Sequence, residues 1–301
     1  MGGWRSRLVV IVAAVAAAVY AGWMSAAAQA PREVDLVMAR VSGRIADYYR
    51  RAQSVICLEQ STVQPIQLNW SPDGLARTVE SELRVEPETA DGDLLPGAKV
   101  IRDIRRINGR APRDRDRKDR SGCTDPNPFS SEPLSFLLPS RREDYRFTSM
   151  REGRDRDRRA LIVDFTTVSR ASKPELIEDE WGHDDCFDWK GPIATRGRVW
   201  VDASTDDVLR VERSLHGPVD VRVPWKLQRR YNFGAYITLE RDDVTMRYRP
   251  VAFSDPDEVM LLPESIESIT LVHGGLQSAR RTDVYRDYRR FLTAGRIVKH
   301  P

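Results

Sequence analysis

Apolar side chains recur at spacings of three and four residues between Pro31 and about Ser54, which is the period of one face of an amphipathic helix. The positions that make this face are Val34, Val37, Val41, Ile45, Tyr48 and Ala52. The pattern predicts one long helix, over about residues 31–54, at the start of the folded domain.

After this segment the period changes, because short runs rich in β-branched and aromatic residues follow, many with every second residue polar. They lie at residues 54–61, 79–86, 100–107, 160–168, 197–202, 208–212, 236–240, 244–248, 268–272 and 281–288. The connections are short and rich in turn residues, which favours an antiparallel meander over parallel strands joined by helices. The predicted fold class is therefore α+β, an antiparallel sheet with a helix in front of it.

Alternation along these runs predicts a broad apolar face on the sheet. If Leu161, Val163 and Phe165 point to one side, the residues on neighbouring strands that share this side are Val199, Val201, Leu209, Val211, Ile237, Leu239, Val244, Met246 and Tyr248. One amphipathic helix does not obviously cover so many side chains. The face either packs as ordinary core, which is the default for apolar residues, or leaves a groove for a hydrophobic ligand.

The first thirty residues are typical of a secretory signal peptide. Arg5 and Arg7 precede an apolar run from Leu8 to about Met24, and the small-residue pattern Ala28-Gln29-Ala30 predicts cleavage before Pro31. We therefore expect a periplasmic or secreted protein. The alternative is an uncleaved leader that anchors the protein, since the apolar run approaches the roughly 18 residues of a spanning helix.

Charge argues against a nucleic-acid partner. The chain has 48 basic and 45 acidic residues, and removal of the leader takes away two arginines and no acid, which leaves 46 and 45. Residues 113–120, RDRDRKDR, alternate in sign, as a solvated surface segment does. Before them, Asn108-Gly109 predicts a two-residue hairpin turn, and the arginines of residues 100–107 are expected on the solvent face of their strand.

Three cysteines are present, Cys57, Cys123 and Cys186. Cys123 follows the basic segment and Cys186 ends an acidic one, residues 174–186, so we hypothesise a disulfide between them, with Cys57 left as a small buried hydrophobe. Three free thiols, or a bridge that uses Cys57, remain the alternatives, because sequence alone does not determine connectivity.

Signatures of catalysis are missing from the sequence, which has no nucleophile elbow, zinc-protease motif, P-loop or dinucleotide-binding glycine motif. The segment His183-Asp-Asp-Cys-Phe-Asp188 lacks the ligand spacing of a zinc or calcium site. Glu59, Asp164 and Asp202 lie on predicted strands, and nothing in their spacing selects an acid pair. We therefore predict no catalytic residue, no metal and no cofactor, and the isolated His216, His273 and His300 are expected to be surface or satisfied side chains.

The hairpin Gly197-Arg-Val-Trp-Val-Asp-Ala-Ser-Thr-Asp-Asp-Val-Leu-Arg-Val-Glu212, with Leu262-Pro263 and the ending Tyr285-Arg-Asp-Tyr-Arg-Arg-Phe291, resembles the LolA-like superfamily. More narrowly, residues 102–115 are similar to a segment of secreted bacterial proteins that share this architecture. Members include periplasmic carriers of lipoproteins and a periplasmic regulator of an anti-sigma factor. The resemblance implies a curved half-barrel closed on one side by a helix, whose apolar concave face holds acyl chains without covalent chemistry. It covers residues 31–295 as a single domain, followed by a tail at 296–301.

Three hypotheses of function follow. The first is a soluble periplasmic protein, peripheral to the membrane at most, that binds a lipid or a lipoprotein acyl chain along Leu161, Val163, Phe165, Val199, Val201, Leu209, Val211, Ile237, Leu239, Met246 and Tyr248. The second is a module that senses or bridges envelope proteins through its charged loops, with the sheet as inert core. The third is a secreted hydrolase, which would need a polar cleft.

Overall fold

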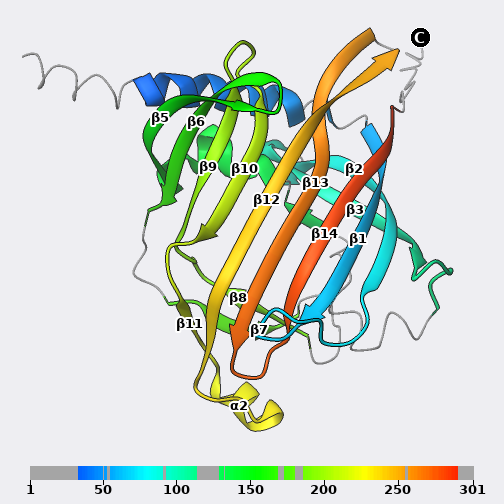
Figure 1. Cartoon of the computed structure of the whole chain (residues 1–301), viewed down its shortest axis with the longest axis vertical. Helices are drawn as coiled ribbons and strands as arrows, with labels where there is room; N and C mark the ends of the chain where they lie inside the picture. Colours follow the sequence, from blue (N-terminus) through cyan, green and yellow to red (C-terminus); the bar gives the residue numbers. More distant parts are fainter. Residues whose placement is uncertain are drawn as a thin grey trace, which may run out of the picture.

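The structure is a computed structural model that describes residues 33–49, 51–52, 55–90, 93–113, 129–131, 133–168, 173–179, 186–254 and 257–290. A single large sheet dominates these residues, and few helices accompany it (Figure 1). Among the residues that the structure describes, no helix is both long enough and apolar enough to cross a membrane.

Fourteen strands form the sheet. Their bounds are β1 Val55–Ile66, β2 Arg77–Ala90, β3 Asp93–Ile107, β4 Phe129–Ser131, β5 Tyr145–Asp155, β6 Arg158–Thr167, β7 Glu175–Glu178, β8 Phe187–Lys190, β9 Thr195–Asp202, β10 Val208–Leu215, β11 Val219–Arg222, β12 Tyr236–Ser254, β13 Asp257–His273 and β14 Ser278–Arg290. The main path runs β4-β3-β2-β1-β14-β13-β12-β10-β9-β6-β5, and a branch leads from β12 through β11 and β7 to β8. β4 and β5 end this path without pairing with each other, so the sheet is open.

The predicted antiparallel arrangement is confirmed, since every strand pair is antiparallel except the single contact between β11 and β7. Short turns join most neighbours, as expected from the sequence. The Asn108-Gly109 turn is present as well. The backbone N–H of Ile107 donates to the carbonyl of Arg110 at 2.8 Å, and both turn residues have positive φ, 48° and 79°. Such values are typical of the two-residue turn that Asn-Gly favours.

The N-terminal helix covers residues 33–49, and residues 51 and 52 are also helical. The predicted range was 31–54, and its ends lie outside the described residues. Its predicted apolar face is buried, with Val34, Val37, Val41, Ile45 and Ala52 all below 5% exposed. In Figure 1 this helix, in blue, runs across one end of the sheet.

Several elements, most of them too short to show a period, were not expected from the sequence. They are β4, β5, β7, β8, β11, the 3-10 helices η3 (Pro133–Leu137) and η4 (Pro139–Asp144), and the helix α2 (Trp225–Tyr231). α2 begins after Pro224 and ends at Asn232, whose left-handed φ of 55° is a common way to terminate a helix. α2 and β11 lie at the end of the sheet opposite the N-terminal helix (Figure 1).

Candidate functional site

The main hydrophobic core lies where the N-terminal helix meets the sheet. Seven of the predicted groove residues belong to it: Val163, Phe165, Val199, Val201, Val211, Met246 and Tyr248. Leu161 packs against its edge, and Val244 is a further member. Alternation therefore identified a real shared face on β6, β9, β10 and the middle of β12.

Leu209 lies on the other face of the sheet, contrary to the prediction. It packs with Ala160 and Trp200 in a separate small cluster. The reason is a register shift between Val208 and Arg210 in the pairing of β10 with β9. Such a bulge adds one residue, so the neighbours Val208 and Val211 face the main core and Leu209 does not.

Ile237 and Leu239 also lie outside the main core. They belong to a second cluster around α2, with Leu176, Leu215, Val221, Val223, Leu227 and Val272. β12 is 19 residues long, and its first part pairs with β11 rather than with β10. One long strand thus contributes to two cores, which strand alternation could not indicate.

Ten of the eleven predicted groove residues are buried, and one of these, Tyr248, lines a cavity beside the N-terminal helix. Two small cavities, each of about 40 Å³, flank the half-buried Tyr48, which lines both. The first has an apolar wall that includes Ala52, Val55, Cys57, Val85 and Tyr288. The second is lined by Ile45, Met260 and Leu261 together with the charged residues Arg44, Arg51 and Asp207.

A buried ion pair borders the first cavity. Arg102 Nε lies 2.5 Å from Glu59 Oε2 and its Nη2 lies 3.0 Å from Oε1, and the Tyr285 hydroxyl donates to Oε1 at 3.0 Å. Glu59 is 1% exposed. Burial opposes the charge on Arg102, but the Glu59 carboxylate outweighs it and raises the pKa of Arg102, while burial raises the pKa of Tyr285 well above its usual value.

Arg102 corrects the prediction that the arginines of this strand face solvent. Arg105 and Arg106 are largely exposed, but the side chain of Arg102 is only 11% exposed and points to the core. Cys57 lies on β1, two residues before Glu59, and belongs to the main core. Burial raises the pKa of its thiol to about 12. A thiol with such a pKa is a structural side chain and not a nucleophile.

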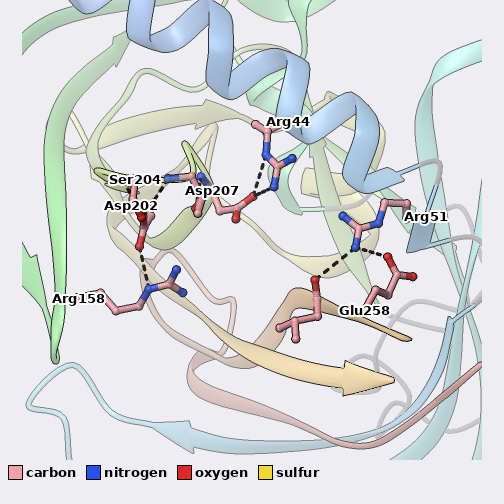
Figure 2. A network of polar contacts seen from close by, with 9 residues as sticks. Arg44, Arg51, Arg158, Asp202, Ser204, Asp207 and Glu258 are labelled. Carbon is pink, nitrogen blue, oxygen red and sulfur yellow. Dashed lines mark hydrogen bonds and ion pairs between the residues drawn. The ribbon is translucent and has the colours of Figure 1, made fainter. Parts of the chain in front are cut away.

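Ion pairs hold the outer side of the helix to the turn between β9 and β10. Arg40 Nε lies 2.8 Å from Asp206 Oδ2, and Arg44 Nη2 lies 2.8 Å from Asp207 Oδ1. Figure 2 shows Arg44 reaching from the helix to Asp207. The same turn is closed internally by Asp202, which accepts hydrogen bonds from Ser204 and pairs with Arg158.

A larger cleft of about 870 Å³ is lined by the start of β5, the end of β6 and the start of β11, and by no residue of the N-terminal helix. Its wall mixes Arg141, Lys173, Asp144 and Asp220 with three prolines, so it is neither apolar nor of one charge.

The acidic residues considered for catalysis do not come together. Glu59 is neutralised by Arg102, Asp164 contacts Ser149, Arg151 and Arg198 on an exposed part of the sheet, and Asp202 closes a turn. His183 and His300 lie outside the described residues, and His273 pairs with Glu240. Within the described ranges no group of three or more potential metal ligands occurs.

Of the two cysteines in the predicted disulfide, the structure describes only Cys186. Cys57 is a free, buried thiol, and Cys186 is buried and disulfide-bonded. Cys123 lies outside the described residues, so the pair Cys123–Cys186 stays a prediction. The charged segment 114–120 and the acidic loop 180–185 lie outside them as well.

No protein-family model matches the chain, and no curated protein matches it. Among solved structures, a LolA superfamily protein from Nitrosomonas europaea is 11% identical, with a TM-score of 0.32, over 83% of this chain and 92% of that one. MucB in complex with MucA is 11% identical, with a TM-score of 0.18, over 83% and 98%. A Pseudomonas aeruginosa MucA/MucB complex is 10% identical, with the same TM-score and coverage.

Proposed function

We propose that this chain is an exported periplasmic binding protein of the LolA-like kind, which holds a hydrophobic ligand, such as a lipid or a lipoprotein acyl chain, between its N-terminal helix and a half-barrel sheet. It acts by binding and release, without covalent chemistry. The proposal of export rests on the leader, residues 1–30, which lies outside the described residues.

A half-barrel is supported by the composition of the main core. One contiguous cluster contains residues of β1, β2 and β3 as well as residues of β6, β9 and β10, although these groups lie toward opposite ends of the strand order. A flat sheet would keep such strands far apart, since neighbouring strands are about 4.8 Å from each other. A sheet curved around the helix brings them to one core.

The observation that carries the proposal is the pair of cavities on the two sides of Tyr48. They lie between the helix and the sheet, and so support the proposal that the helix covers the apolar face incompletely. At about 40 Å³ each they hold no acyl chain, so binding requires the helix to lift. The outer ion pairs of the helix suit such a movement, because exposed pairs are worth at most about 1 kcal/mol each.

The test is to express the full chain with its leader in a bacterial periplasm, purify it gently, and measure bound ligand by native mass spectrometry and organic extraction. We expect a lipid in near-stoichiometric amount. Ala52→Leu should fill the apolar cavity and lower the occupancy several-fold while the protein stays folded. Leu75→Ala, at a residue that is 93% exposed, is the matched control and should leave the occupancy unchanged.

Substitution of the core residue Phe165 by a charged residue would not test ligand binding, because it would also test folding. Phe165 is 1% exposed and contacts the rings of Phe136, Tyr145 and Phe147, so a charge there would unfold the domain.

A wild-type protein that is folded but carries no ligand would contradict the proposal. The sheet would then be inert core, and the interaction module would become the better hypothesis.

A further inference from the structure

One carboxylate, next in sequence to Val259 in the lining of the second cavity, pairs with two guanidinium groups. Glu258, near the start of β13, pairs with Arg51 from the end of the N-terminal helix and with Arg290 from the end of β14. Arg51 also donates to the carbonyl oxygen of Val259 at 3.3 Å. Figure 2 shows Arg51 directed from the helix toward Glu258.

Arg290 has more donors than acceptors around it. Its side chain is 11% exposed, it lies over the ring of Phe253 at 5.0 Å, and its Nη2 lies 3.1 Å from the sulfur of Met260. Its Nε is buried without a hydrogen-bond partner among the described residues. A guanidinium carries five N–H donors, and a buried donor without a partner costs free energy. A further acceptor would therefore be stabilising at this position.

The second cavity, next to this cluster, is lined by both apolar and charged side chains. Tyr48, Met260 and Leu261 line it together with Arg51, and Arg44 and Asp207, which pair with each other, line it as well. Glu258 is 22% exposed and Arg51 is 35% exposed, so solvent and solutes reach the pair. Apolar side chains beside two guanidinium groups that share one carboxylate, Glu258, are complementary to an amphipathic molecule that has a hydrocarbon chain and an anionic head.

We propose that the ligand is a lipid with an anionic headgroup, a carboxylate or a phosphate, bound by Arg51 and Arg290 while its acyl chain passes Tyr48 under the helix. Glu258 occupies the arginines in the ligand-free protein and competes with the headgroup for them. This inference rests on the proposed function, because it specifies the class of ligand for the same groove.

The experiment compares matched probes on the full chain, freed of lipid, by native mass spectrometry. Oleate is compared with oleyl alcohol, and oleoyl-lysophosphatidylglycerol with oleoyl-lysophosphatidylcholine. We expect the anionic member of each pair to bind at least about tenfold more tightly, since a hydrogen bond to a charged group changes an equilibrium by a factor of roughly ten or more. A preference for oleate alone would identify a free carboxylate as the head.

Three variants and one control test the residues. Arg51→Gln and Arg290→Gln should each lower affinity for the anionic probes about tenfold and leave the neutral probes unchanged, whereas Glu258→Gln should raise affinity for the anionic probes. Arg105→Gln is the control, because Arg105 is half exposed and pairs with Glu82 away from the groove. Circular dichroism checks folding. If Arg290→Gln fails to fold, the opposite effects of Arg51→Gln and Glu258→Gln on affinity for the anionic probes still test the proposal.

The outcomes separate the two proposals. Equal affinity for charged and neutral probes in the wild-type protein overturns the anionic headgroup and leaves the hydrophobic groove in place. A Glu258→Gln variant that weakens anionic binding as the arginine variants do also overturns it, because the cluster would then be structural. If no probe binds, the proposed function itself fails.

Discussion

Whether a charged side chain of this protein is buried or exposed depends on its partner and not on its residue type alone. Arg102 stands in an arginine-rich strand, yet its guanidinium is buried against Glu59 and Tyr285. Burial of two charges is costly, and good geometry with added hydrogen bonds is what offsets that cost. The bidentate contact and the tyrosine hydroxyl supply both here.

We predict that Arg102→Met lowers the free energy of unfolding by about 3–5 kcal/mol, because it leaves the Glu59 carboxylate buried without compensation. The double variant Glu59→Gln with Arg102→Met should recover a large part of the loss, since glutamine still accepts from Tyr285 and carries no charge. Urea unfolding of the wild-type protein, both single variants and the double variant measures the coupling. Equal losses in Arg102→Met and in the double variant would show that the two charges do not depend on each other.

At the scale of elements, the close approach of β9 to its neighbours places Gly197 where no larger residue fits. A Cβ atom at this position would lie 2.1 Å from the carbonyl oxygen of Glu212 on β10 and 2.6 Å from the ring of Phe165 on β6. Gly197 thus allows the Phe165 ring to pack across the strand.

Gly197→Ala is therefore expected to lower the free energy of unfolding by about 1–3 kcal/mol, because the added Cβ atom would push β10 and the Phe165 ring away from β9. Gly217→Ala is the matched control, because a Cβ atom there would meet nothing within 4 Å. Thermal unfolding of the two variants provides the comparison. If both lose the same stability, the loss comes from the properties of glycine in the unfolded chain and not from the contact.

At the scale of the whole molecule, one helix joins parts of the chain that are distant in sequence. Its inner face belongs to the main core, Ser42 donates to the carbonyl of Leu137 in η3 at 2.7 Å, and Arg142 of η4 pairs with Asp35. Its outer contacts with Asp206 and Asp207 are half exposed. Because its outer contacts are exposed ion pairs and not strand pairing, we expect the N-terminal helix to separate from the sheet before the sheet itself opens.

We predict that Arg40→Gln combined with Arg44→Gln speeds amide hydrogen exchange of residues 33–49 a few-fold and leaves the amides shared by β1 and β2 unchanged. High salt should reduce the difference between variant and wild type, because it screens the exposed pairs. Exchange that increases equally in helix and sheet would show that the helix does not move as a separate unit.

The residue patterns by themselves determined the antiparallel sheet, the buried face of the helix, the Asn108-Gly109 turn and most of the apolar residues that share the core. These features follow from local periodicity, which depends only on where each side chain points along its own element. The positions of Leu209, Ile237 and Leu239 depended on bulges and on a change of strand partner, which no run of residues encodes by itself. The same holds for the inward turn of Arg102 and for the cluster of Arg51, Glu258 and Arg290, whose members come from three elements. Only the tertiary structure decided these, because a charge finds its partner through packing between elements that are far apart in sequence.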